Sequence, residues 1–240
     1  YGGNAMVEPE LMASVLEDIT LLKYVGLNPV LVHGGGPAID QNLEKLDLES
    51  KFHRGLRITT EKIMKVVEEV LVGQVNSKIV SLANKAGCQA VGLSGTDANL
   101  IEARKYQGVQ EVDLGYVGEV ERINPQILKT VIENGYFPIV APVGGDKEGN
   151  SYNINSDLVA GEIAAALEAE KLILLTNVEG ILSDPEDPDS LISQLTEPEV
   201  KTMLEREQII GGMIPKVNSC LQALDGGVHR THILDGRLDH

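Results

Sequence analysis

The feature that most constrains the fold of this chain is a short apolar run followed directly by three glycines and a helical pattern. Pro29 to Val32 has the composition of a buried strand, and Ala38 to Leu46 has the apolar spacing of a helix. Between them, His33-Gly34-Gly35-Gly36-Pro37 places bare backbone N–H groups at the positive end of that helix. The segment predicts a strand–turn–helix unit that can hold an anion. Tight packing alone is the alternative explanation of these glycines.

The glycine segment does not match either common nucleotide-binding motif. Ile39 stands where the dinucleotide fingerprint G-x-G-x-x-G requires its third glycine. The chain contains no G-x-x-x-x-G-K-[ST] sequence. These observations exclude a P-loop and a standard nicotinamide site.

Strand and helix patterns alternate along the rest of the chain. Helical spacing covers 11–22, 61–86, 125–134, 156–167 and 196–207 and resumes at 215, and strand patterns cover 89–93, 137–141, 171–176 and 232–234. Short glycine-punctuated segments between 100 and 123 predict antiparallel hairpins, and a hairpin turn is expected at 144–150. We therefore expect an α/β fold, a three-layer sandwich whose mostly parallel central sheet has helices on both faces and a flanking β-hairpin region.

Composition narrows the possible partners. The 240 residues include 20 Lys and Arg against 36 Asp and Glu, a net charge of −16, which disfavours nucleic acid and anionic membranes. No apolar stretch approaches the ~20 residues of a membrane span, and no secretory signal is visible. Cys88 and Cys220 lack metal-ligand spacing. We expect a cytoplasmic protein with no nucleic-acid or membrane partner.

Three further places carry side chains suited to anionic chemistry. Arg57 follows a glycine turn, and its planar guanidinium suits a carboxylate, with an ordinary surface arginine as the alternative. Either Asn155 or Ser156 could be the N-cap of a helix that carries Asp157 early, where a carboxylate could orient a lysine. Lys216 is expected in the first turn of another helix, where a cation opposes the helix dipole. That unfavourable placement favours a functional role for Lys216.

Five segments, taken together and in order, resemble the signatures of the acetylglutamate kinases, a branch of the amino acid kinase family. They are Tyr1-Gly2-Gly3-Asn4-Ala5-Met6, His33-Gly34-Gly35-Gly36-Pro37, Gly55-Leu56-Arg57, Asn153-Ile154-Asn155-Ser156-Asp157 and Gly212-Met213-Ile214-Pro215-Lys216-Val217. The resemblance implies a kinase that transfers the ATP γ-phosphoryl group to the side-chain carboxylate of N-acetyl-L-glutamate, giving N-acetyl-L-glutamyl 5-phosphate in arginine biosynthesis. ATP and Mg²⁺ would be the cofactors. It also implies one amino acid kinase domain over 1–240, with an acetylglutamate-binding lobe at about 1–170 and an ATP-binding lobe at about 171–240.

The same resemblance implies roles on the substrate side. Gly35 and Gly36 would offer backbone N–H groups to N-acetyl-L-glutamate. Arg57 would grip a substrate carboxylate, and Asn153 would hydrogen-bond the substrate. A carboxylate is already an anionic nucleophile, so the chemistry needs positioning and positive charge rather than a general base.

On the catalytic and nucleotide side, Lys216 would neutralise charge on the transferring phosphoryl group, and Asp157 would hold the catalytic lysines in place. No protein ligand is expected for Mg²⁺, which would sit mainly on the phosphates. The adenine-nucleotide site would comprise Gly3, Asn177, Val178, Gly180, Ile181, Leu182, Gln208, Ile209 and Ile210.

Both ends of the sequence are expected to be truncated. In the family a catalytic lysine directly precedes the Tyr-Gly-Gly segment, whereas this sequence starts at Tyr1. The segment Gly226 to Arg237 resembles the arginine-inhibited members, which implies feedback inhibition by L-arginine and a homo-oligomer, either a dimer or a hexamer. Two alternatives stay open: a sister kinase acting on another carboxylate, such as a carrier-bound aminoadipate, and a non-catalytic module that binds nucleotide or arginine.

Overall fold

The computed structural model describes residues 1–3, 9–108, 112–184, 186–187 and 189–237. Its helices are α1 (Pro9–Tyr24), α2 (Gly36–Lys45), α3 (Glu61–Glu68), the π-helix η2 (Glu69–Asn76), α4 (Ser77–Lys85), the 3₁₀ turn η3 (Asp97–Asn99), α5 (Gln126–Glu133), α6 (Ser156–Ala166), α7 (Glu197–Glu205) and α8 (Met213–Asp225). Its strands are β1 (Leu31–Val32), β2 (Phe52–His53), β3 (Leu56–Arg57), β4 (Ala90–Ser94), β5 (Ile101–Lys105), β6 (Gly118–Ile123), β7 (Phe137–Ala141), β8 (Val143–Gly145), β9 (Ser151–Asn153), β10 (Lys171–Thr176) and β11 (Arg230–Asp235).

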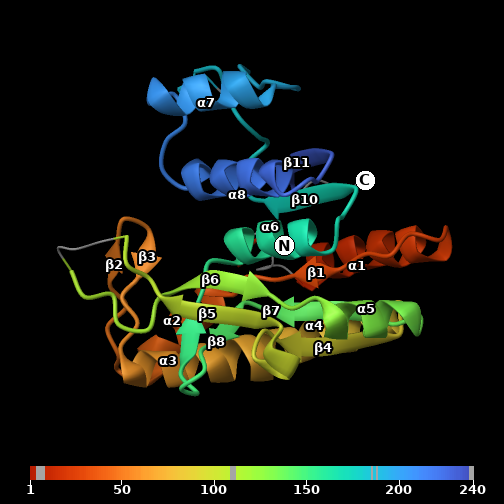
Figure 1. Ribbon diagram of the computed structural model, residues 1–240, viewed down its shortest axis with the longest axis vertical. Coiled ribbons are helices and arrows are strands. Elements are labelled where there is room, and N and C mark those ends of the chain that lie inside the picture. The colour runs from red at the N-terminus through yellow and green to blue at the C-terminus, as the bar shows by residue number, and fades with distance from the viewer. Residues whose placement is uncertain (4–8, 109–111, 185, 188, 238–240) are drawn as a thin grey trace.

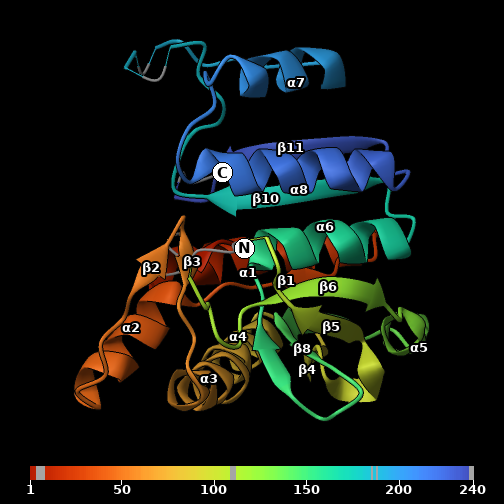
Figure 2. The same ribbon diagram turned by 60° about the vertical axis from the view of Figure 1, so that its left-hand side comes forward.

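Two groups of parallel strands form the centre of the molecule. Strands β1, β7 and β4 pair in that order, and β10 pairs with β11 along its whole length. Figures 1 and 2 show β10, β11, α7 and α8 at one end, strands β4 to β8 at the other, and α6 between them. The first residues bridge the two groups, since Gly2 N–H donates to Leu175 O at 2.8 Å and Gly34 N–H donates to Tyr1 O at 2.9 Å.

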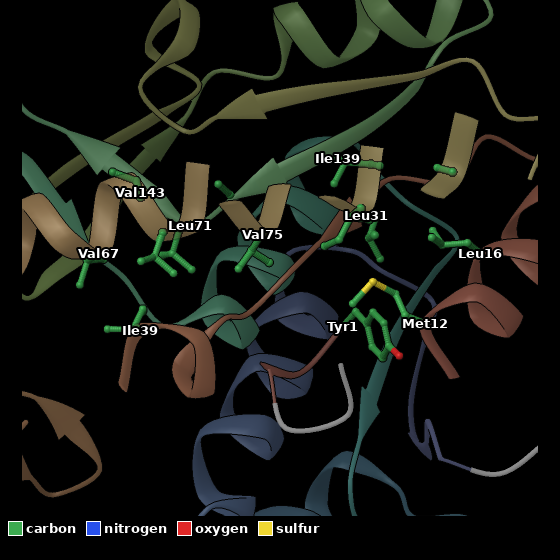
Figure 3. Close-up of a cluster of buried hydrophobic side chains, with 14 of the residues drawn as sticks. Tyr1, Met12, Leu16, Leu31, Ile39, Val67, Leu71, Val75, Ile139 and Val143 are labelled. Atoms are coloured by element: carbon green, nitrogen blue, oxygen red, sulfur yellow. The ribbon is translucent and has the colours of Figure 1, made fainter. Parts of the chain in front are cut away.

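Strand β7 is buried along its whole length and faces two separate cores. Phe137 and Ile139 point into a cluster shared with α1, α3, η2 and α4, part of which Figure 3 shows. Val140 points the other way, into a cluster with Leu128 of α5 and Val159 of α6. Side chains alternate across a strand, so one strand serves both cores. Helices therefore cover both faces of the central sheet, and the predicted α/β sandwich is confirmed.

The flanking hairpins occur where the sequence predicts them. Strands β5 and β6 pair antiparallel between 101 and 123, and β8 and β9 pair antiparallel across the turn near 144–150. Together they form a four-stranded sheet in the order β6-β5-β8-β9. Strand β9 ends at Asn153, and Asn155 then caps α6. This short connection places both asparagines beside the start of α6.

The predicted helix over 61–86 is helical throughout but changes type in the middle. Thr60 accepts a hydrogen bond from Ile63 N–H at 3.4 Å and caps α3, after which eight residues form η2 before α4 begins. Residues five apart lie roughly 140° apart around an α-helix. In a π-helix they are hydrogen-bonded and stack on one face. Leu71 and Asn76 consequently share one face of η2.

Two boundaries near the C-terminal end differ from the sequence analysis. Helix α8 begins at Met213 rather than Pro215, so Lys216 is its fourth residue and stands at the end of the first turn. Strand β11 begins at Arg230, two residues before the expected start. No helix within the described residues is long and apolar enough to cross a membrane. The division into two lobes near residue 170 stays a prediction.

Candidate active site

A pocket of about 180 Å³ lies where the glycine turn, β3, β9 and the start of α6 meet. Gly35, Gly36, Arg57 and Asn153 all line it, although they come from three distant parts of the sequence. Residues expected on the substrate side are thus brought to one place. The walls combine main-chain amides and an arginine with apolar side chains such as Leu71, a composition suited to a small polar ligand.

Two glycine turns pack against each other beside this pocket. A Cβ atom built on Gly3 would lie 2.9 Å from Gly35 N and 3.0 Å from Gly36 N, and one built on Gly34 would lie 2.6 Å from Gly3 N. Any side chain at these positions would separate the turns. No main-chain carbonyl of the described residues outside α2 accepts a hydrogen bond from the N–H of Gly35 or Gly36. These two donors lie at the start of α2, where main-chain N–H groups can bind an anion, and we call them the anion cradle.

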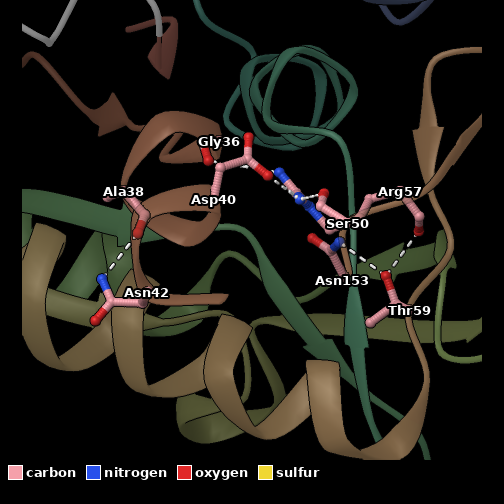
Figure 4. Close-up of polar contacts among 8 residues, drawn as sticks. All are labelled: Gly36, Ala38, Asp40, Asn42, Ser50, Arg57, Thr59 and Asn153. Atoms are coloured by element: carbon pink, nitrogen blue, oxygen red, sulfur yellow. Dashed lines mark hydrogen bonds and ion pairs between the residues drawn. The ribbon is translucent and has the colours of Figure 1, made fainter. Parts of the chain in front are cut away.

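Arg57 is held over the cradle by several contacts. Its Nη1 donates to Asp40 Oδ1 at 2.5 Å and to Ser50 Oγ, and its Nη2 donates to Gly36 O at 3.4 Å, as Figure 4 shows. The guanidinium also lies 4.6 Å from the centre of the Phe52 ring. Its hydrogen bond lowers the pKa of the Asp40 carboxyl below the ordinary value. Arg57 is therefore oriented in advance, with one guanidinium nitrogen already paired to a carboxylate.

Thr59 connects Asn153 to the arginine segment. Asn153 Nδ2 donates to Thr59 Oγ1 at 3.2 Å, and Thr59 Oγ1 donates to Arg57 O at 2.7 Å. Thr59 is fully buried, so its hydroxyl is shielded from water. Thr59 was not predicted from the sequence, because a threonine two residues after an arginine has no distinctive signal.

Lys216 and Asp157 form a largely buried ion pair. Lys216 Nζ lies 2.8 Å from Asp157 Oδ2, and the two side chains are 17% and 13% exposed. Asn155 Oδ1 accepts the N–H groups of Asp157 at 2.8 Å and Leu158 at 3.2 Å, which makes Asn155 the N-cap of α6. Asp157 therefore stands in the first turn of a helix, where the dipole favours a carboxylate. The pairing expected from the sequence is present.

A close crossing of α6 and α8 brings this ion pair together. A Cβ atom built on Gly161 would lie 2.8 Å from Ser219 Oγ and 2.9 Å from Ser219 O. Ser219 Oγ also donates to Asp157 O. Gly161 thus permits the approach that sets Lys216 beside Asp157. Neither Gly161 nor Ser219 was predicted from the sequence, although a glycine inside a strong helical pattern is a signal of close packing.

The residues predicted for the nucleotide side follow β10 and surround the start of α8. Ile181 and Ile209 pack into a cluster with Met203 and Val217, and Ile209 is only 4% exposed. The side chain of Ile209 is thus part of the core, and only the main chain of this residue could contact a ligand. Leu182 pairs in an isolated bridge with Leu191.

The remaining nucleotide-side residues lie around this cluster. Asn177 accepts a hydrogen bond from Thr176 Oγ1 at 3.4 Å, and Gln208 N–H donates to Met203 O at 3.0 Å. Val178 and Ile210 are exposed, and Gly180 has a φ of +153°. None of the described residues between 177 and 210 lines the 180 Å³ pocket, whereas Gly3 packs against the cradle. Asn4, Ala5 and Met6 of the first motif lie outside the described residues.

Comparisons with known proteins identify the family of this chain. The profile described as "Amino acid kinase family" matches residues 1–235. The curated acetylglutamate kinase of Moorella thermoacetica is 53% identical over 247 residues, covering 100% of this chain and 83% of its own length, and that of Pelotomaculum thermopropionicum is 54% identical over 248 residues, with 100% and 84% covered. A crystal structure of smu.665 from Streptococcus mutans superposes with a TM-score of 0.85 at 32% identity, covering 98% of this chain and 92% of that one. This chain belongs to the amino acid kinase family.

Proposed function

We propose that the protein transfers the γ-phosphoryl group of ATP to the side-chain carboxylate of N-acetyl-L-glutamate, a step of arginine biosynthesis. The observation that carries this proposal is identity above 50% to curated acetylglutamate kinases over the whole chain. The pocket supports it, because the cradle, Arg57 and Asn153 offer donors to a small acid with two carboxylates. The reaction gives an acyl phosphate, N-acetyl-L-glutamyl 5-phosphate, and ADP.

The mechanism rests on holding two anions together. The attacking carboxylate needs no proton removed, so the protein's task is to align it with the phosphorus and to balance negative charge. In our proposal Arg57 and Asn153 bind the substrate, and the N–H groups of Gly35 and Gly36 donate hydrogen bonds to the carboxylate that reacts. Lys216, held by Asp157, supplies positive charge to the oxygens of the phosphoryl group as it moves. A buried ammonium that is already oriented does not have to reorganise during the reaction.

Nucleotide binding is proposed for the far side of this arrangement, with the polyphosphate reaching toward Gly3 and Lys216. Asn177, Val178, Gly180, Ile181, Leu182, Gln208, Ile209 and Ile210 would surround the nucleoside. Among the described residues no group of three or more His, Cys, Asp or Glu side chains could hold a metal ion. Mg²⁺ would be held mainly by phosphate oxygens, where it would neutralise charge on ATP.

Several finer features belong to the same proposal. L-Arginine would act as a feedback inhibitor through the Gly226 to Arg237 segment, and the protein would assemble as a dimer or hexamer in the cytoplasm. In the described part of that segment Asp235 is buried and binds Arg237 through both carboxylate oxygens, at 2.9 and 2.7 Å. An arginine ligand could use the same carboxylate in place of Arg237. Titration with L-arginine under calorimetry, with L-lysine as control, tests this part.

Product detection tests the function and separates it from the alternatives. The complete protein is incubated with MgATP and either N-acetyl-L-glutamate, L-glutamate or N-acetyl-L-aspartate, and acyl phosphate is trapped with hydroxylamine. We expect a hydroxamate with N-acetyl-L-glutamate and little with the other two acids. A preference for another carboxylate would favour a sister kinase. No hydroxamate with any of them, together with retained nucleotide binding, would favour a non-catalytic module.

A further inference from the structure

His33, the first residue of the glycine turn, is fully buried and connects three elements. Its Nδ1 lies 2.8 Å from Gly34 O, and its Nε2 lies 3.1 Å from Nδ2 of Asn76 in the π-helix η2. Asn76 Nδ2 also donates to Ile139 O of β7 at 2.9 Å. The imidazole is thus fixed from both sides, in a place where the proposed mechanism gives it no role.

The partners of His33 determine which ring nitrogen carries the proton. An amide nitrogen can only donate, so Nε2 must accept the hydrogen bond from Asn76. The single proton of the neutral ring is then on Nδ1, which donates to Gly34 O. Burial lowers the pKa of His33 to about 4, which keeps the ring neutral at ordinary pH. The amide of Asn76 therefore selects the tautomer that binds the glycine turn.

The bond to Gly34 O has a direct consequence for the anion cradle. Gly34 O and the N–H of Gly35 belong to one planar trans peptide and point in opposite directions. Fixing the oxygen on the His33 side aims the Gly35 N–H away from His33. A donor on the carbonyl also polarises the peptide and strengthens the N–H at its other end.

The π-helix supports the turn at two points on one face. A Cβ atom at Gly35 would overlap the side chain of Leu71, so Leu71 packs directly on the cradle. Asn76, five residues later, reaches His33, and its Oδ1 occupies the space that a Cβ at Gly92 would need. In an α-helix, Leu71 and Asn76 would point in different directions, and only one of them could reach the glycine turn. The π-helix therefore allows both side chains to contact the turn.

We propose that His33 and Asn76 are positioning residues that orient the Gly35 N–H toward the substrate in the anion cradle. This inference rests on the proposed function, because the cradle's ligand is the carboxylate substrate or the phosphoryl group that it accepts. Neither His33 nor Asn76 needs to touch the substrate. Replacing either side chain would weaken substrate binding by changing the orientation of the Gly34–Gly35 peptide group.

Steady-state kinetics of substituted full-length protein test the inference. Asn76→Ala and His33→Leu should raise the KM for N-acetyl-L-glutamate roughly 10- to 100-fold, the scale of a donor misplaced by about 1 Å, and leave the KM for ATP within about twofold. His33→Asn should recover most of the loss, because its amide can still donate to Gly34 O. Gln74→Ala is the matched control, since it removes an exposed amide from the same π-helix. Equal changes in both KM values, or an unchanged Asn76→Ala enzyme, would overturn the inference.

Ring ¹⁵N NMR of histidine-labelled protein gives a readout that does not depend on turnover. The wild type should show a neutral His33 with the proton on Nδ1, and Asn76→Ala should move the signal toward the Nε2–H form. A wild-type ring protonated on Nε2 alone would contradict the positioning role whatever the activity. A protein that has the expected tautomer but no activity on N-acetyl-L-glutamate would reject the proposed function while supporting the hydrogen-bond network.

Discussion

Replacing Gly161 by alanine inserts a methyl group into the crossing of α6 and α8. The added carbon would lie 2.8 Å from Ser219 Oγ and 2.9 Å from Ser219 O, whereas ordinary contact begins at 3.4 Å. The helices must therefore move apart by about 0.5 Å (3.4 − 2.9). Overpacking of this kind costs about 1–3 kcal/mol, and alanine's better helix propensity returns about 1 kcal/mol. We expect a net loss of up to about 2 kcal/mol, which at this chain length lowers the Tm by at most about 4–8 °C.

The same substitution should also slow catalysis. Separation of α6 from α8 pulls Lys216 away from Asp157, and a shift of half an ångström at a reacting centre corresponds to about a tenfold loss of kcat. Product formation at saturating substrates, measured beside a thermal melt, gives both quantities. Gly73→Ala is the control, since this helical glycine has nothing within 4 Å of the added carbon. If Gly161→Ala loses stability but retains wild-type kcat, the crossing does not position the ion pair.

Two further predictions concern Arg57 and His33. Arg57→Ala should raise the KM for N-acetyl-L-glutamate about 10- to 100-fold, because a charged hydrogen bond contributes about 1.5–3 kcal/mol, and leave the KM for ATP nearly unchanged. Equal increases would mean that Arg57 is structural. Because the pKa of His33 is lowered to about 4 in the folded protein, the histidine is protonated in the unfolded chain but neutral in the folded protein between pH 6.5 and about 4. Stability should therefore be full above pH 6.5 and fall by about 2 kcal/mol between pH 7.5 and 5, and His33→Asn should abolish this difference in urea denaturation.

The fold could be predicted because each element carries its own local pattern. Strand β7 is a continuous apolar run, as a strand buried on both faces requires, and the asparagine that caps α6 precedes a helical pattern. Patterns of this kind depend on neighbours in the sequence, so one chain suffices to see them. The placement of a cation near a helix start indicated a functional role for Lys216, whereas its pairing with Asp157, 59 positions away, was implied by the family resemblance.

What the sequence did not show depends on contacts between distant segments. The π-helix η2 has the apolar composition of an ordinary helix, and its altered turn becomes apparent only through the contacts of Leu71 and Asn76 with the glycine turn. Thr59 and Ser219 are small hydroxyl residues whose partners lie 94 and 62 positions away in the sequence. Their roles follow from packing, which no local pattern encodes.

The central claim is that Lys216, held by Asp157, meets negative charge on the phosphoryl group as it is transferred. Single-turnover phosphoryl transfer at saturating MgATP and N-acetyl-L-glutamate measures this step directly. Lys216→Ala in the complete protein should slow the step by roughly 10²–10³-fold, the scale of one preorganised electrostatic contact, with a smaller change in nucleotide affinity. Lys216→Arg should recover only part of the rate, because a planar guanidinium cannot place its charge where a compact ammonium does. A Lys216→Ala protein that melts like the wild type and transfers phosphate at the wild-type rate would contradict the account.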